Sequence, residues 1–326
     1  MDPKEKMMEA IACFQAAQRV YTEQEYPIPW ASTQYYIGAL YRYLPKERWN
    51  ENLPKAIAYW EAASKVQGER AFPSLWVLLH ANLGKAYEDL ISEDRCANLG
   101  KAIACYQAGR EIDSTKVDPM LRAMVQIRWG LALNNLGKEY SDRKTGDRNE
   151  NLQLAIACHD SALKVFSEHD GTAQWASTQV LLGEACSHLP TGDRGKNLRQ
   201  AIACYEAALR VRNKRDYLID WITIQNDLGS AYMELPLGDR GENLKQALTC
   251  FEAALGAADE RKFPLYFAVT QKNMGNAYAV LPFGDPQENR KKAVKCLEDA
   301  LRGYQVSGCD SEVQQLKQRL VELKSP

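Results

Sequence analysis

Nine cysteines and four histidines are the residues of this 326-residue chain whose types could support metal binding or nucleophilic catalysis. The histidines have no Cys or His partner at the spacing typical of zinc ligands. They are His80, His159, His169 and His188. Six cysteines recur instead at one position of a sequence repeat. They are Cys13, Cys105, Cys158, Cys204, Cys250 and Cys296. Neighbouring copies should lie roughly 16 to 20 Å apart, too far for a disulfide. We therefore expect small buried hydrophobic residues in a reducing compartment, and we predict no metal, no cofactor and no catalytic residue.

Other motifs with a known chemistry are also missing from the sequence. The segment Gly192–Asn197 lacks the spacing of a phosphate-binding loop and recurs along the chain as a turn. No Ser/His/Asp or Cys/His arrangement can be assembled. A cluster of Arg210, Arg212, Lys214 and Arg215 ends a predicted helix, where cations favour the helix dipole. Because 41 Lys+Arg residues face 42 Asp+Glu residues, giving a net charge of -1, we predict no nucleic-acid partner.

The recurring residues belong to a repeat of 46 residues. A glycine preceded by Leu, Ile or Met returns at intervals of 46, 53, 46, 46 and 46 residues. These glycines are Gly38, Gly84, Gly137, Gly183, Gly229 and Gly275. Eight positions before them stand Trp30, Trp76, Trp129, Trp175, Trp221 and Phe267. Eighteen positions after them stand Ala56, Ala102, Ala155, Ala201, Ala247 and Ala293. The seven extra residues of the longer interval fall between Ile112 and Ala123, where we expect a longer connection containing Pro119.

Each repeat contains two helical patterns, which we name helix A and helix B. Helix A runs from about the aromatic residue to about six residues past the glycine. Helix B follows after a short turn, and in one repeat its apolar face runs from Leu244 to Ala254. In the same repeat Pro236 ends helix A, and Asp239 with Glu242 predicts an N-cap with a capping box. The sequence therefore predicts an all-α chain of helix pairs.

The two ends of the chain extend this pattern. Asp2-Pro3-Lys4-Glu5 repeats the cap of helix B, and a mixed-polarity helix runs from Asp310 to about Lys324. We predict one domain over residues 1–326, with a half repeat at 1–26, six helix pairs at 27–308 and a capping helix at 309–326, about 14 helices in all. In the first full repeat Pro54 would fall inside helix B, so we expect that helix to begin late, near Asn52.

The repeat resembles a known family. Leu228-Gly229-Ser230-Ala231-Tyr232 in helix A, followed by an Ala-x-x-x-aromatic-x-x-Ala pattern in helix B, resembles the tetratricopeptide repeat (TPR). The resemblance covers nearly the whole chain, although its repeat is longer than the usual one of about 34 residues. The segment Asn134-Asn135-Leu136-Gly137 resembles the long-repeat kinesin-light-chain class found in bacteria. The resemblance implies a TPR-like α-solenoid, a right-handed superhelix of antiparallel helix pairs.

The resemblance also implies a binding groove lined by helix A. In the family, groove positions lie three and two residues before the glycine and one and four after it. The polar candidates at these positions include Tyr35, Asn82, Lys85, Asn134, Lys138, Asn226, Ser230, Lys272, Asn273 and Asn276. Amide side chains suit such a surface because each offers a donor and an acceptor to an extended peptide, and lysines can pair with a carboxylate. The alternative is that these residues are the solvated face of amphipathic helices.

We predict from this pattern a non-catalytic interaction scaffold that binds a peptide or protein segment in its groove. The resemblance leaves two alternatives open, a regulator that binds bacterial tubulin-like filaments and a regulatory partner of a caspase-like (CHAT-type) peptidase. No apolar run is long enough to span a bilayer and the first residues lack a secretion signal, so we expect a cytoplasmic protein without a membrane partner. The first helix B could stack on a second copy to form a homodimer.

Overall fold

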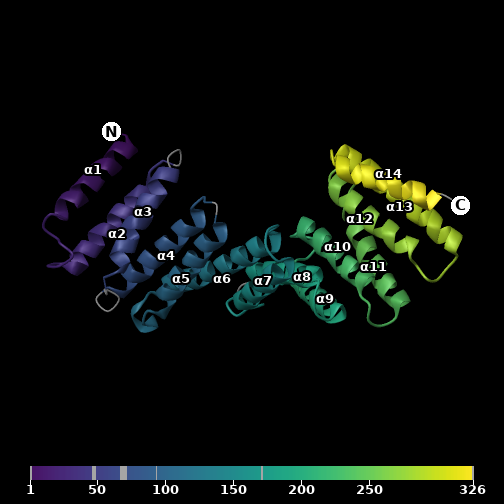
Figure 1. The fold of residues 1–326 in the computed structure, drawn as a ribbon, viewed down its shortest axis with the longest axis horizontal. Helices are drawn as coiled ribbons and strands as arrows, with labels where there is room; N and C mark the ends of the chain where they lie inside the picture. Colours follow the sequence, from purple (N-terminus) through teal and green to yellow (C-terminus); the bar gives the residue numbers. More distant parts are fainter. Residues whose placement is uncertain (1, 46–48, 67–71, 93, 170–171, 325–326) are drawn as a thin grey trace. The chain divides into compact units, whose positions relative to one another are not determined.

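The computed structural model of the protein describes residues 2–45, 49–66, 72–92, 94–169 and 172–324. Within these ranges the chain forms 14 α-helices, one 3-10 turn at Ser114–Lys116 and no strand (Figure 1). The prediction of an all-α fold with about 14 helices is confirmed. Among the described helices, each is too short or too polar to cross a lipid bilayer.

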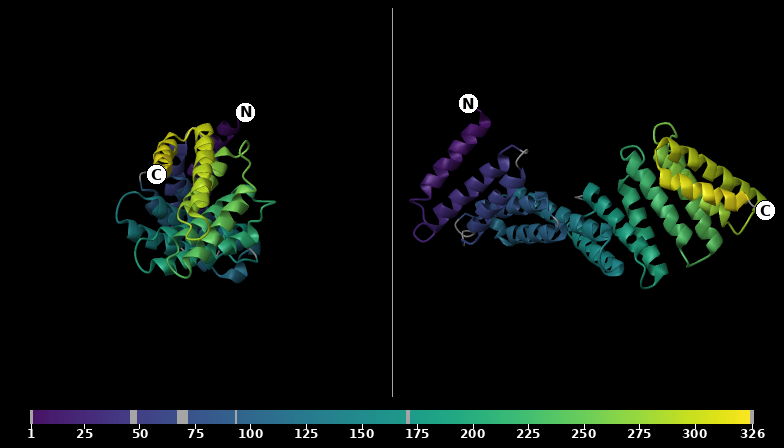
Figure 2. Two further views of the ribbon diagram at one scale, coloured as in Figure 1. Left: turned by 90° about the vertical axis from the view of Figure 1, so that its right-hand side faces the viewer. Right: turned by 45° about the horizontal axis from the view of Figure 1, so that its top comes forward.

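The helices alternate between the two predicted types. The A helices are α2 (Pro27–Tyr43), α4 (Pro73–Asp89), α6 (Pro119–Asp142), α8 (Thr172–His188), α10 (Leu218–Glu234) and α12 (Pro264–Ala279). The B helices are α1 (Pro3–Ala17), α3 (Trp49–Ser64), α5 (Arg95–Glu111), α7 (Arg148–Leu163), α9 (Arg194–Val211), α11 (Arg240–Leu255) and α13 (Pro286–Val306). A final helix, α14 (Asp310–Lys324), packs on α13 and buries Val313, Leu316 and Leu320, as predicted for a capping helix (Figure 2).

Contacts along the chain divide it into two compact units. The N-terminal unit comprises Met1–Asp142 with Asp160–Phe166, and the C-terminal unit comprises Arg143–His159 with Ser167–Pro326. Consecutive helices pack on each other from α1 to α6 in the first unit and from α8 to α14 in the second. Successive A helices also touch, α2 with α4 and α4 with α6, and likewise α8 with α10 and α10 with α12. Each unit is therefore a stack of helix pairs, whereas one solenoid over residues 1–326 stays a prediction.

The repeated glycine is required where an A helix meets its B helix. A Cβ atom on Gly84 would lie 2.7 Å from the ring of Tyr106, and one on Gly229 would lie 2.5 Å from the ring of Phe251. Both aromatic side chains are fully buried. Because carbon atoms in contact sit at about 3.5 to 4.0 Å, any side chain at the glycine would push the two helices apart. The Gly and aromatic pair thus sets the spacing within a repeat.

The turn between helix A and helix B is held by three residues of the repeat. Gly238 has a φ of 83°, a left-handed conformation that glycine adopts without strain. The Asp239 carboxylate accepts the backbone N–H of Glu242 at 2.8 Å, which caps α11. The Asn243 amide donates to the carbonyl of Leu237 at 2.9 Å and ties the turn to the helix. The predicted N-cap is therefore present.

The capping box predicted for the same turn is not formed there. The Glu242 side chain pairs with Lys245 at 2.6 Å instead of returning to the backbone of its cap. A complete box forms in α1, where the Asp2 N–H donates to the Glu5 carboxylate and the Glu5 backbone N–H donates to the Asp2 side chain. A glutamate at this position can bond either to the backbone N–H of the cap residue or to a neighbouring lysine. Where the lysine is present, as in α11, the glutamate pairs with it.

The expected late start of the first full helix B is wrong. The helix α3 includes Trp49, seven residues before its repeated alanine, which is also where the other B helices begin. Pro54 lies inside it and removes one backbone donor. Because Leu53, Ala56 and Trp60 are buried on one face of α3, their packing outweighs the loss of that hydrogen bond.

The predicted longer connection between Ile112 and Ala123 is also wrong. The seven extra residues extend a helix, since α6 has 24 residues whereas α4 and α8 have 17 each. The helix begins at Pro119, and the Asp118 carboxylate accepts the backbone N–H of Met120 at 3.1 Å. Aspartate before a helix and proline at its first position are a favoured start. The insertion therefore adds about two turns to the N-terminal end of α6.

Candidate functional site

The cysteines of the repeat differ in exposure. Cys204 and Cys250 are buried, as expected, but Cys13 is exposed on α1, which packs mainly on α2. The remaining copies, Cys105, Cys158 and Cys296, are partly buried. Burial raises the pKa of the Cys105 thiol to about 12 and that of Cys250 to about 11, so both stay protonated at neutral pH. Among the described residues, no group of three or more His, Cys, Asp or Glu side chains is arranged to hold a metal ion.

Two histidines occupy repeat positions with different surroundings. His159 in α7 is fully buried at the position of Tyr106 and Tyr205, and burial lowers its pKa to about 4. It is therefore a neutral packing residue, as its position suggested. His80 in α4 is partly buried, and its Nδ1 donates to the carbonyl of Trp76 at 2.8 Å. This bond turns the His80 ring back onto its own helix.

In the N-terminal unit, the predicted groove residues contact one another or their own helix. The Asn82 amide donates to the Tyr35 hydroxyl at 3.1 Å and so joins α4 to α2. Lys85 pairs with Asp89 at 2.7 Å. The other two predicted residues lie on α6. Lys138 is exposed and pairs with Asp142 at 2.8 Å, whereas Asn134 is buried with 6% of its surface exposed.

In the C-terminal unit, the predicted residues form a ladder between α10 and α12. Asn226 is only 5% exposed, and its amide donates to the carbonyl of Ile222 at 3.0 Å and to the Thr270 hydroxyl at 2.9 Å. The Asn273 amide donates to the Asn226 carbonyl oxygen at 3.3 Å. The Ser230 hydroxyl donates to the backbone of Asn226 at 2.9 Å. Asn226 thus joins two A helices instead of facing solvent.

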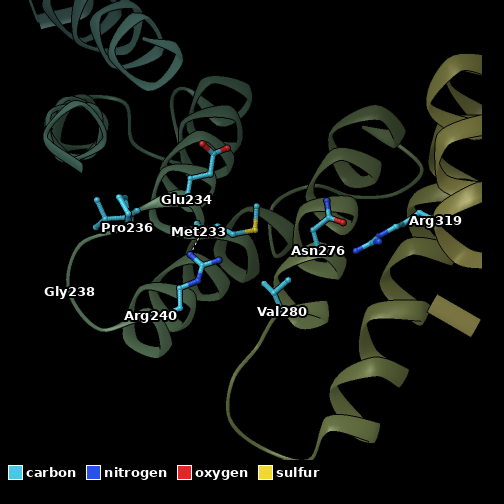
Figure 3. A pocket seen from close by; sticks show the side chains of 9 residues that line it. Met233, Glu234, Pro236, Gly238, Arg240, Asn276, Val280 and Arg319 are labelled. Carbon is cyan, nitrogen blue, oxygen red and sulfur yellow. Dashed lines mark hydrogen bonds between the residues drawn. The ribbon is translucent and has the colours of Figure 1, made fainter. Parts of the chain in front are cut away.

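The other two predicted residues of this unit lie on α12. The Lys272 ammonium sits 5.8 Å from the centre of the Tyr304 ring, so it rests against α13. Asn276 is partly buried and faces a cavity of about 660 Å³. Figure 3 shows Asn276 and Arg319 of α14 pointing toward one another across this cavity, while Glu234 and Arg240 lie on its other side. The capping helix therefore contributes a cation to the A-helix face.

A second cavity of the C-terminal unit, about 610 Å³ in volume, lies along α8 and α10 and is strongly charged. Glu184, Asp227 and Glu234 line it, and Arg194 pairs with Glu234. Burial, and then the charge of Glu184, raise the pKa of Asp227 to about 7. No hydrogen bond to the Asp227 carboxylate is formed from the described part of the chain. This cavity therefore offers more negative than positive charge.

The N-terminal unit has a cavity of the opposite character. It measures about 1140 Å³ and lies between α4 and α6. Its lining is Ser74, Leu78, Lys85, Glu88, Asp118, Met120, Leu121, Ala123, Met124, Ile127, Arg128, Leu131 and Asn135. Met120 is 81% exposed, Ile127 43% and Leu131 39%. Large apolar side chains left open to solvent in one concave place mark a binding surface.

The added turns of α6 build the end of this cavity. Met120, Leu121 and Met124 all lie in the two turns that the other A helices lack. Of the predicted groove residues, only Lys85 lines this cavity. The apolar floor of this cavity was not predicted from the sequence, because the extra residues were expected in a longer connection. The signal was present, since Asp118-Pro119 repeats the Asp-Pro pair that starts α1.

The predicted residues are therefore spread over separate places. Asn82 with Tyr35 and Asn226 with Asn273 join neighbouring A helices, while Lys85, Ser230 and Asn276 each line a different cavity. Comparison of the chain with protein-family models and with curated proteins finds no match.

Proposed function

We propose that the chain is a non-catalytic interaction scaffold of the tetratricopeptide-repeat type, whose A helices bind a segment of another protein. The observation that carries this proposal is the cavity between α4 and α6, where large apolar side chains such as Met120 and Ile127 remain exposed along one concave surface. A stack of helix pairs leaves one edge of each A helix free of its neighbours, so a partner can contact several repeats at once.

The other cavities support the same role. The cavity between α4 and α6 and the cavities of about 660 and 610 Å³ are each lined in part by A helices, and their linings combine charged groups with apolar surface, as protein interfaces do. The raised pKa values of Cys105 and Cys250 favour contact over nucleophilic chemistry, because a protonated thiol is a poor nucleophile.

The proposal is tested by site-specific photo-crosslinking in a lysate of the source organism. A photo-reactive amino acid replaces Leu131 on α6 or Asn276 on α12, and as controls it replaces the exposed Gln107 on α5 or Glu252 on α11. We expect discrete crosslinked products from the A-helix positions and none from the B-helix positions. Crosslinks confined to the B-helix positions would move the binding surface to the other side of the stack.

Mass spectrometry of the crosslinked products also separates the partner classes. A tubulin-like protein would select the filament regulator, and a caspase-like peptidase would select the regulatory partner. An unrelated protein crosslinked at Leu131 or Asn276 would support the scaffold without either specialisation.

A further inference from the structure

We infer that the cavity between α4 and α6 docks an amphipathic helix of a partner protein, in one orientation that is set by charge. This inference rests on the proposed scaffold function and names the segment that the scaffold binds. It is carried by the apolar floor of the cavity, by the length of that floor and by the charges at its two ends.

The floor is a single stripe on α6. Met120, Met124, Ile127 and Leu131 follow one another at steps of four, three and four residues, which places their side chains along one face. Across the cavity, Leu78 of α4 faces this stripe. Two of the four are methionines, whose flexible side chains adapt to the shape of a bound apolar surface.

The length of the stripe matches a short helix. Eleven residues separate Met120 from Leu131, which corresponds to roughly 16 Å of helix, or about three turns. A partner helix with apolar residues at positions i, i+4, i+7 and i+11 covers the same length with its own stripe. An extended strand with alternating side chains would place every second residue away from the floor.

The two ends of the cavity differ in charge. Asp118 stands at the N-terminal end of α6, beside Met120. Toward the other end, the side chains of Lys85, Glu88 and Arg128 lie close to the Tyr106 hydroxyl. The Tyr106 hydroxyl donates to Glu88 at 3.0 Å and also interacts with Arg128, while Lys85 lies 3.5 Å from Glu88. Asp89 also lies here and pairs with Lys85 at 2.7 Å and with Arg42 at 3.0 Å. Three cations and two carboxylates leave this end with a net positive charge.

The partner helix should therefore carry a basic residue beside Asp118 and an acidic residue beside Lys85 and Arg128. The reversed arrangement would set like charges against each other at both ends. A second copy of the chain is the competing occupant, and the test below distinguishes it.

The test selects peptides on the purified full-length chain. A display library encodes helices of about 14 residues, roughly four turns, with Leu, Ile or Met fixed at positions i, i+4, i+7 and i+11 and all other positions random. Selection is run on the wild type and on three variants: Met120→Glu and Ile127→Glu in the cavity, and Val321→Glu as control. Val321 is an exposed apolar residue of α14, 67% accessible, so it matches the charge change outside the cavity. Circular dichroism and thermal unfolding confirm that each variant is folded.

We expect enriched peptides that bind the wild type and Val321→Glu equally and bind each cavity variant at least tenfold more weakly. Enriched sequences should carry an acidic residue at one end and a basic residue at the other. Swapping these two residues should weaken binding several-fold at low salt and less at high salt. A photo-crosslinker at the acidic end should label α4 near Lys85 and leave the residues around Met120 unlabelled.

Three results would overturn the inference. A library that yields no binder, or binders that retain full affinity for both cavity variants, would exclude a helix in this cavity. Sedimentation showing a wild-type dimer that becomes monomeric in Met120→Glu would assign the cavity to a second copy. In each case, crosslinking from Leu131 or Asn276 to another protein would leave the scaffold function standing, so the two proposals fail separately.

Discussion

The two units share one repeat motif but present different surfaces along their A helices. In the N-terminal unit the cavity between α4 and α6 is floored by Met120, Ile127 and Leu131. In the C-terminal unit the cavities along α8, α10 and α12 are lined by charged groups such as Glu184, Asp227 and Arg319. The contacts inside a repeat are alike in both units, whereas the exposed edge is free to vary. Recognition should therefore reside in the residues that depart from the repeat.

The two units also differ in the hydrogen bond that joins successive A helices, which we call the joint. Tyr35 and Asn82 bond in the N-terminal unit, and Asn226 and Asn273 bond in the C-terminal unit. Both pairs use the position three residues before the glycine in one repeat and two residues before it in the next. The first joint is partly exposed, whereas the second is centred on a buried asparagine that also binds Thr270. The same two repeat positions thus form a partly exposed joint in one unit and a more buried joint in the other.

Acid should affect the C-terminal unit first, and this is the largest effect we predict. The neutral form of His159 is favoured in the fold, because burial lowers its pKa from about 6.5 to about 4. As pH falls through this window the unfolded chain takes up a proton that the folded chain does not. Stability should therefore fall by about 3 kcal/mol between pH 6.5 and pH 4.

Urea unfolding at several pH values measures this loss, and hydrogen exchange locates it. His159→Phe, which places a Phe251-like ring in the site, should remove most of the pH dependence. An unchanged acid loss in His159→Phe, or earlier opening of the N-terminal unit, would contradict the prediction.

Removing the asparagine side chain from each joint should lower the free energy of unfolding by different amounts. Asn226→Ala should cost about 2 kcal/mol, because it removes two bonds donated by a buried amide and leaves the partly buried Asn273 amide without its acceptor. Asn82→Ala should cost less than about 1 kcal/mol, because water can replace the amide beside the partly exposed Tyr35. Chemical unfolding of both variants measures the difference. Equal costs would mean that the two joints are alike and that the contrast between the units is confined to the cavities.

The smallest effect concerns the charged cavity. Burial and Glu184 raise the pKa of Asp227 to about 7, so the folded chain favours its protonated form. Stability is then lost as pH rises from about 4, its unfolded value, through about 7. Asp227→Asn should remove this loss and stabilise the protein by about 1 kcal/mol at pH 8, since partial exposure weakens the effect. At pH 4 the variant and the wild type should unfold at the same urea concentration; a gain that persists there would point to a cause other than charge.

Much of the fold was predictable from the sequence. The glycine with its aromatic residue and alanine at fixed distances defines two helices per repeat, because only a residue without a side chain fits against Tyr106 or Phe251. The bounds of α14 and the start of α1 follow from Asp and Pro at helix starts. The start of α3 was misjudged because the cost of Pro54 was weighed without the packing of Trp60.

The site was less predictable. An asparagine on an A helix, such as Asn226, suits solvent, a ligand or a neighbouring helix equally well, and only the distance between α10 and α12 decides. The apolar floor of the cavity in the N-terminal unit could have been predicted, because Asp118-Pro119 marks the start of a helix. The exposure of Met120 could not be predicted from the sequence, since it depends on how far α6 extends beside α4.

The size of the insertion in α6 has a geometric consequence. Seven residues rotate an α-helix by about 700°, only about 20° short of two complete revolutions. Because these residues lie at the N-terminal end of α6, the chain enters the lengthened helix from nearly the same side as in the other A helices. Three added residues would instead have turned that entry point by about 60° around the helix axis. A repeat array can thus acquire a longer edge at one place, in steps of seven, while the remaining layers stay in phase.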